Sequence, residues 1–308
     1  MSLLATSQPL PFDQTVALGA IAGLTIFLGL PIGRLRTLDT RARVALAMFS
    51  VGILAFIFMD VGSHAEGIIE SHLLDYKHGT GSLWTVAGLF AILAVGFTAG
   101  SAGLTVIERR LHSGLAAARR APLPPVAGGS AETATLEPGG VAGVTAEAAA
   151  LNAAEEARRR ALRTGLTVAI AIGLHNFAEG LAIGVSAATG AVGLATVLII
   201  GFGAHNATEG FGIVGPLGDA RPSWRWLAVA GVIGGGPTFL GTIVGYQLTS
   251  SPLELLFYGL AAGALIYVIG EIWTAMRRYG HRELALLMLS AGFLAGVLTD
   301  LIVSYGGA

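Results

Sequence analysis

Eight long apolar runs dominate this sequence and restrict what it can fold into. Each run is close to the roughly 20 residues that a helix needs to cross about 30 Å of hydrocarbon. Charged residues make up 12% of the chain, whereas about 25% is usual in soluble domains. The sequence therefore predicts an all-α membrane protein with eight transmembrane helices, at residues 15–33, 43–61, 83–106, 164–189, 192–217, 225–248, 254–275 and 284–303.

The basic residues orient these helices. Of the 18 lysines and arginines, all the arginines lie in or beside the connections between predicted helices 1 and 2, 3 and 4, 5 and 6, and 7 and 8. Lys77, the one lysine, lies in the connection between helices 2 and 3. Basic residues accumulate on the cytoplasmic side of membrane proteins. We therefore expect a protein of the cell (inner) membrane with both termini outside the cytoplasm. The net charge of -1 gives no sign of a nucleic-acid partner, and the absence of cysteine excludes a thiolate metal site.

One long connection divides the chain into three parts. Residues 1–106 hold three predicted helices, residues 107–162 form a cytoplasmic and largely disordered loop, and residues 163–308 hold the other five helices. Residues 121–150 are rich in Ala, Gly, Pro and Thr, a composition that cannot bury a core. We expect the stretch from Glu155 to Arg163 to extend the fourth helix beyond the membrane. Whether the loop is a tether or a regulatory segment stays open.

A repeated phrase in the fourth and fifth helices carries the chemistry. His175-Asn176-Phe177-Ala178-Glu179-Gly180 recurs thirty residues later as His205-Asn206-Ala207-Thr208-Glu209-Gly210. Residues three and four apart share a helix face, so each copy presents an imidazole, an amide and a carboxylate together. Such groups at membrane depth are expensive and mark a function. Two imidazoles with two carboxylates suit Zn²⁺, and they could also take Fe²⁺, Mn²⁺ or Cd²⁺. The predicted metal ligands are His175, Asn176, Glu179, His205, Asn206 and Glu209.

Further polar residues lie outside the repeated phrase. Asp60 and His64 are four residues apart, so they share a face if the second helix continues, and we expect them on a pathway for the cation. The outside loop 62–82 either concentrates cations or is an ordinary solvated loop. Ser50 either faces the site or bonds its own helix backbone, and Asp300 is expected to be simply hydrated. Gly231 to Pro237 indicates a helix that is broken or kinked, or one that is closely packed.

The repeated His-Asn-x-x-Glu-Gly phrase resembles the ZIP (Zrt/Irt-like protein) family of divalent metal transporters. The resemblance covers the eight helices, the outside termini and the long third connection. It implies an inverted-repeat bundle of 3+2+3 helices, often a homodimer, that moves zinc and related metals into the cytoplasm. It also implies that the six residues of the repeated phrase are the transport-site ligands, and that Glu271 lies at the depth of an exit path.

The chain departs from the family pattern at three places. The usual proline before the glutamate is Ala178 in one copy and Thr208 in the other. The long loop has a single histidine, His112, so a histidine-rich sensing segment is absent. Where many members have a carboxylate on the sixth helix, this chain has Gly236. We therefore expect one tightly held metal in each subunit, with a second position weak or empty.

Other functions are weighed against metal import. An intramembrane metal-dependent hydrolase could use the same ligands, but no His-Glu-x-x-His sequence is present and no further Glu or His near the phrase is free to act as a base. A retinal-type pump needs an intramembrane lysine, and Lys77 lies in a predicted loop. Export through the same site stays open, because the ligands do not encode direction. We therefore expect a transporter and not an enzyme.

Overall fold

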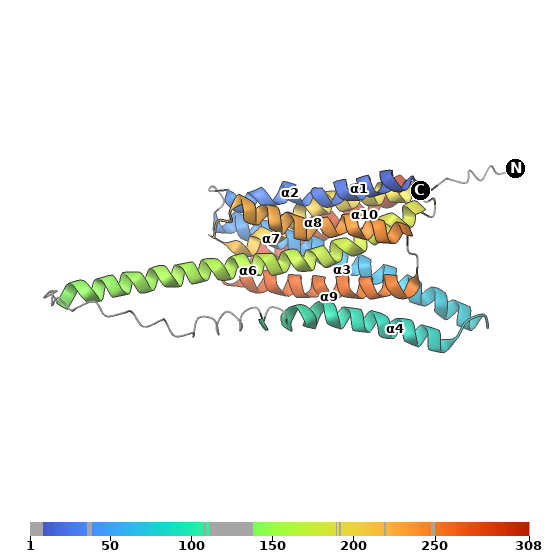
Figure 1. The fold of residues 1–308 in the computed structure, drawn as a ribbon, viewed down its shortest axis with the longest axis horizontal. Coiled ribbons are helices and arrows are strands. Elements are labelled where there is room, and N and C mark those ends of the chain that lie inside the picture. Colours follow the sequence, from blue (N-terminus) through green and yellow to red (C-terminus); the bar gives the residue numbers. More distant parts are fainter. Residues whose placement is uncertain are drawn as a thin grey trace, which may run out of the picture.

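The chain folds into long helices that lie side by side in one bundle (Figure 1). The computed structural model describes residues 9–35, 39–106, 109–110, 138–188, 190, 192–218, 220–247 and 250–307. Within these residues every regular element is helical. The elements are α1 (Phe12–Leu24), α2 (Ile26–Gly29), the 3-10 turn η1 (Leu30–Arg34), α3 (Thr40–Lys77), α4 (Leu83–Thr98), the π-helical turn η2 (Ala99–Gly103), α6 (Pro138–Ala188), α7 (Val192–Val214), the 3-10 turn η3 (Gly215–Leu217), α8 (Trp224–Gln247), α9 (Ser251–Arg277) and α10 (Arg282–Gly307).

The all-helical prediction is confirmed for the described residues. Seven segments there are long and apolar enough to cross a membrane: Phe12–Arg34, Thr40–Lys77, Leu83–Val106, Ala149–Ala188, Trp224–Gln247, Ser251–Arg277 and Arg282–Ile302. The fifth predicted segment, residues 192–217, is occupied by α7, which has 23 residues, and by the turn η3 that follows it. In Figure 1, α1 begins and α10 ends at one end of the bundle, and α6 projects from the opposite end.

The first segment is not one regular helix. At Thr25 the helix is interrupted between α1 and α2, and the Thr25 hydroxyl donates to the carbonyl oxygen of Ala22 at 2.7 Å. A threonine that bonds the backbone of the preceding turn competes with the regular helix ladder. This interruption matters for the site, because the carbonyl of Ala22 receives a second donor from α7.

The segment predicted as an outside loop begins as a continuation of α3, so the loop prediction is wrong for residues 62–77. This stretch lacks proline, and its Ala65, Glu66, Glu70, Leu73 and Leu74 are residues that favour a helix. Asp60 and His64 were expected to share a helix face if the second helix continued. Because α3 continues to Lys77, this expectation is confirmed. The helix ends with a turn at Gly79, whose φ of 77° favours glycine.

The helix α6 begins at Pro138 and continues to Ala188, well beyond the predicted fourth helix. The prediction of disorder is therefore wrong for residues 138–150, while residues 111–137, including His112, lie outside the described residues. The predicted extension through Glu155 is confirmed, and Glu155 pairs with Arg159 at 2.9 Å. Glu–Arg pairs four residues apart stabilise an exposed helix, which explains how this polar segment stays helical.

Small residues let α8 pack closely against its neighbours. Cβ atoms added at Gly235 and Gly241 would lie less than 3.0 Å from the carbonyl oxygens of Gly23 on α1 and Phe177 on α6. The helix is continuous from Trp224 to Gln247 even though Pro237 lies inside it. Of the two interpretations of the glycine-rich run, the structure favours close packing, since the helix is not broken.

Candidate metal centre

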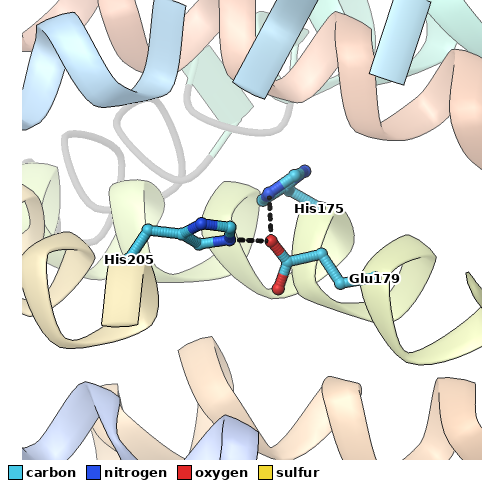
Figure 2. Close-up of side chains that lie close together, drawn as sticks. All are labelled: His175, Glu179 and His205. Atoms are coloured by element: carbon cyan, nitrogen blue, oxygen red, sulfur yellow. Dashed lines mark hydrogen bonds and ion pairs between the residues drawn. The ribbon is translucent and has the colours of Figure 1, made fainter. Parts of the chain in front are cut away.

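The two copies of the repeated phrase meet where α6 and α7 pack together. Nε2 of His175 lies 3.0 Å from Oε1 of Glu179. Nε2 of His205, from α7, contacts the same carboxylate oxygen (Figure 2). One ligand atom from each of these three residues lies within 4.8 Å of the other two. The expected pairing of the two phrases across the bundle is therefore present in the geometry.

The centre is enclosed. His175, Asn176 and Asn206 are fully buried, and Glu179 and Glu209 are 4% and 1% exposed. Oε1 of Glu209 lies 3.8 Å from Nε2 of His175, so Glu209 also faces the cluster of His175, Glu179 and His205. The side chain of His205 is 14% exposed, the largest exposure among the four. Access to the centre therefore lies on the His205 side.

Several acceptor atoms at the centre lack a hydrogen-bond donor. Among the described residues, no hydrogen-bond donor is within bonding distance of Oε2 of Glu179, either carboxylate oxygen of Glu209, or the amide oxygens of Asn176 and Asn206. Within the described residues, the ion pairs of both glutamates are with histidine and not with lysine or arginine. A buried carboxylate without a countercharge costs several kcal/mol. A divalent cation held by these oxygen and imidazole donors would satisfy them, so the donor set fits zinc and similar ions.

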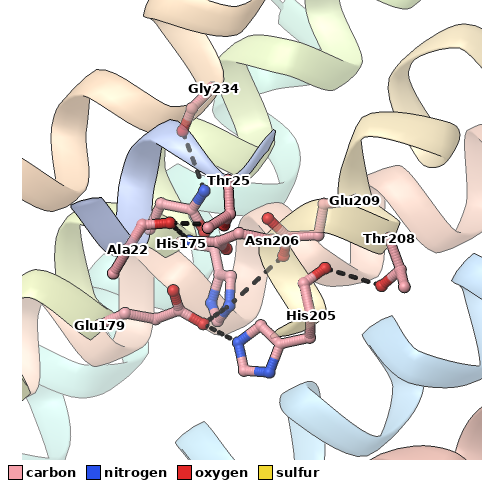
Figure 3. A network of polar contacts seen from close by, with 10 residues as sticks. Ala22, Thr25, His175, Glu179, His205, Asn206, Thr208, Glu209 and Gly234 are labelled. Atoms are coloured by element: carbon pink, nitrogen blue, oxygen red, sulfur yellow. Dashed lines mark hydrogen bonds and ion pairs between the residues drawn. The ribbon is translucent and has the colours of Figure 1, made fainter. Parts of the chain in front are cut away.

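The two asparagines tie the centre to the neighbouring helices. Nδ2 of Asn176 donates to the carbonyl of Gly234 on α8 at 3.0 Å, and Nδ2 of Asn206 donates to the carbonyl of Ala22 on α1 at 3.2 Å (Figure 3). Each asparagine thus uses its amide nitrogen for a backbone contact and leaves its oxygen for a ligand. The carbonyl of Ala22 lies beside the interruption at Thr25, so this feature of α1 supports the site.

The packing beside each asparagine repeats in the same register. A Cβ at Gly180, four residues after Asn176, would collide with the carbonyl of Thr238, four residues after Gly234. A Cβ at Gly210, four residues after Asn206, would collide with the carbonyl of Ile26, four residues after Ala22. The two halves of the centre are therefore built by equivalent contacts, with α8 against α6 and α1–α2 against α7.

Thr208, which replaces the usual proline, makes local hydrogen bonds of its own. Its hydroxyl donates to the carbonyl of His205 at 2.7 Å. Its carbonyl accepts from the hydroxyl of Ser50 on α3 at 2.9 Å. Ser50 is 1% exposed, so this bond is shielded from water and connects α3 to the helix that carries His205. The sequence offered only the buried position of a polar residue as a signal for this contact.

The three possible pathway residues lie outside the cluster. The carboxylate of Asp60 is 3.7 Å from Nδ1 of His64, and the two side chains are 32% and 51% exposed. Asp60 is also within electrostatic range of His205 and of Asp300 on α10. Glu271 lies at a cleft of about 920 Å³ between α6 and α9. The structure thus brings Asp60 near the centre and separates Glu271 from it.

Gly236 does not contact the helices that carry the site. A Cβ at Gly236 would meet only Val232 of its own helix, at 3.8 Å, among the atoms described. Thr238 is fully buried, and its hydroxyl oxygen has no hydrogen-bond partner in the described part of the chain. A Cβ at Gly236 thus has no neighbour on α6 or α7 within 4 Å, while Thr238 and Thr242 are fully buried polar residues of α8.

Comparison with known proteins shows which family the chain belongs to. The family model described as ZIP Zinc transporter matches residues 14–269. The chain is 32% identical to "Zinc transporter ZupT" of Clostridium perfringens over 150 residues, which are 46% of this chain and 51% of that protein. It is 35% identical to "Zinc transporter ZIPB" of Bordetella bronchiseptica over 133 residues, 41% of this chain and 42% of that protein.

A longer match is with "Zinc transporter ZupT" of Corynebacterium aurimucosum, 26% identical over 284 residues, 88% of this chain and 90% of that protein. The matches to the first relatives span about half of their length. The family model, in contrast, covers most of this chain, including all the helices from α1 to α8 and the centre itself. With its long apolar helices, the chain is an integral membrane protein that belongs to the ZIP Zinc transporter family.

Proposed function

We propose that this protein carries divalent metal ions, zinc foremost, into the cytoplasm by alternating access through the centre on α6 and α7. The observation that carries the proposal is the buried cluster of His175, Glu179 and His205, with unpaired carboxylate oxygens beside it. A transported cation is the group that would satisfy these oxygens. Membership of a family described as zinc transporters supports the same cargo. We propose His175, Asn176, Glu179, His205, Asn206 and Glu209 as the ligands.

Zinc flux in sealed proteoliposomes tests this proposal and separates it from an intramembrane hydrolase. We expect the purified protein to move zinc across the vesicle membrane while lipid and peptide substrates stay intact. Measuring the uptake with and without a pH gradient also reports on proton coupling. A hydrolytic activity that disappears in His175→Ala, together with no net zinc flux, would favour the hydrolase instead.

We further propose eight transmembrane helices in an inverted repeat, with α7 as the fifth. Support comes from the repeated register of contacts, in which Asn176 and Gly180 face α8 as Asn206 and Gly210 face α1–α2. The start of α1 and the end of α10 at one end of the bundle agree with an even number of crossings (Figure 1). By analogy with the family we propose a homodimer in the inner membrane.

The orientation can be tested with single cysteines, since the chain has none of its own. The arginines of the connections gather at the end from which α6 projects, and we propose this end as cytoplasmic. We expect Leu151→Cys, on the exposed part of α6, to react with an impermeant thiol reagent only from the cytoplasm. Thr80→Cys, at the other end, should react only from outside. The reverse labelling pattern would refute the orientation. Position 80 is preferred to position 79, because Gly79 has a positive φ that would strain a cysteine at position 79.

We propose that the ion enters past Asp60 and His64 and leaves past Glu271. Asp60 is partly exposed and lies within electrostatic range of His205, the ligand with the most exposure. A carboxylate at that place would draw a cation toward the centre. Residues 107–162 would be a cytoplasmic connection, of which α6 forms the final part.

The centre is expected to hold one zinc ion in each subunit. Two dications close together repel strongly and need bridging and flanking anions, and the repeated phrase supplies only Glu179 and Glu209. A Cβ at Gly236 would have no contact with α6 or α7 within 4 Å, so the direct test of the ion number is made on the natural protein. Anomalous diffraction at the zinc edge should show one fully occupied peak between α6 and α7. Two fully occupied peaks would contradict the single-ion expectation.

A further inference from the structure

A cavity lies apart from the metal centre, between the projecting part of α6 and the end of α9. It has a volume of about 920 Å³. Arg158 and Arg160 line it from α6. Arg278, the residue that directly follows α9, also lines it. Thr164, Thr274 and Tyr279 also line it. The cavity, which we name the α6–α9 cleft, thus has arginines and hydroxyl-bearing residues in its lining.

The charge of the α6–α9 cleft is positive on balance. Glu156 and Glu271 are its two acidic residues, against three arginines. Arg160 lies 3.6 Å from Glu156 and Arg158 lies 3.7 Å from Glu155, so each of these arginines has an acidic neighbour on α6. The arginines of this cleft can therefore attract an anion, whereas Glu271, on α9, is the carboxylate past which the cation is proposed to leave.

Arg278 is held in place for such a role. Its guanidinium donates to the Tyr279 hydroxyl at 3.1 Å and lies 4.9 Å from the centroid of the same ring. A guanidinium has five N–H donors in a planar fork, and these contacts use few of them. Planar forks of this kind match the oxygens of phosphate in a bidentate manner.

We propose that the α6–α9 cleft binds a phosphate-bearing anion, either the headgroup of an anionic phospholipid or free phosphate. Basic pockets between transmembrane helices on the cytoplasmic side bind anionic lipid headgroups in this way. The cleft lies at the end of the bundle where the arginines gather. An anion held by Arg160 and Arg278 would link α6, which carries His175 and Glu179, to the end of α9. This inference goes beyond the transport function and does not rest on it.

Two matched double variants test the site. Arg160→Gln with Arg278→Gln removes two arginines that line the cleft. Arg159→Gln with Arg277→Gln removes their sequence neighbours, which do not line it. The pairs are alike in charge and in position, and Arg159 pairs with Glu155 as Arg160 pairs with Glu156. Any effect of net surface charge should therefore be the same in both variants.

Binding is measured by native mass spectrometry of the detergent-solubilised protein with added phosphatidylglycerol, phosphatidylcholine or inorganic phosphate. We expect the natural protein and the control variant to retain phosphatidylglycerol in preference to phosphatidylcholine. The cleft variant should bind phosphatidylglycerol at least about tenfold more weakly, because charged hydrogen bonds are lost. Displacement of the lipid by an equal concentration of inorganic phosphate would identify free phosphate as the source, and its failure would identify the headgroup.

The proposal is overturned if both double variants lose the same affinity, or if phosphatidylglycerol is retained no better than phosphatidylcholine. Thermal unfolding and zinc content of each variant show whether it is folded. If the cleft variant does not fold, Arg278→Lys replaces it, since lysine keeps the charge and loses the planar fork. In that variant we expect weaker binding of phosphatidylglycerol than in Arg277→Lys, and equal binding in the two would again overturn the proposal.

Discussion

Glu179→Gln is expected to abolish zinc transport and to weaken zinc binding by roughly a hundredfold or more. One oxygen of Glu179 contacts both imidazoles, so this carboxylate is at the middle of the candidate ligand set. Glutamine keeps the shape and removes the charge. A unit charge about 4 Å away contributes about 4 kcal/mol even at an effective dielectric constant of 20, and 1.4 kcal/mol is a factor of about ten in affinity. Zinc uptake into proteoliposomes and calorimetric titration with zinc measure the two effects.

Glu155→Gln is the matched control for that substitution. Glu155 is on the same helix, but its carboxylate is exposed and pairs with Arg159. We expect this variant to bind and transport zinc as the natural protein does. Glu209→Gln should also stop transport, with a smaller loss of affinity, because the closest imidazole is 3.8 Å from Glu209. Normal transport by both site variants, at normal protein yield, would place the transport site elsewhere.

Gly241→Ala is expected to destabilise the folded bundle strongly. The added Cβ would lie less than 3.0 Å from the carbonyl oxygen of Phe177, a separation that real Cβ atoms essentially never show. The obstructing atom belongs to the backbone of α6, so α6 and α8 must move apart instead of a side chain turning away. Overpacking of this kind costs about 1–3 kcal/mol or more. Thermal unfolding in detergent should show a clearly lower midpoint and a lower yield of folded protein.

Gly236→Ala serves as the control on the same helix. Here the new Cβ meets only Val232 at 3.8 Å, an ordinary contact. Alanine is also favoured over glycine inside helices by about 1 kcal/mol, so we expect an unchanged or slightly higher midpoint. If Gly241→Ala unfolds at the same temperature as Gly236→Ala, the packing of α6 against α8 is looser than the structure indicates. A matching loss of zinc binding in Gly241→Ala alone would connect that packing to the centre, since Asn176 is bonded to Gly234 across the same contact.

The sequence alone determined the helical class and the pairing of the two phrases, and seven of its eight predicted spans correspond to helices long and apolar enough to cross a membrane. Length and hydropathy decide whether a segment can cross a membrane, and they are local properties. The candidate ligands could be selected because three- and four-residue spacing puts His175 with Glu179, and His205 with Glu209, on one helix face. The sequence was less informative where no apolar pattern exists. The continuation of α3 to Lys77 and the start of α6 at Pro138 were missed, because polar helices resemble loops in composition.

The tertiary structure alone decided which groups meet across helices. The carbonyl of Ala22 accepts from Asn206, and Ser50 donates to Thr208, although these partners lie 184 and 158 residues apart. A backbone carbonyl has no signature in a sequence, and a single buried serine has many possible partners. Position 236 shows the same limit, since the rotation of α8 about its axis turns Thr238 inward and Gly236 away. That rotation is fixed by glycine contacts on α1 and α6 together, and such contacts exist only once the bundle is assembled.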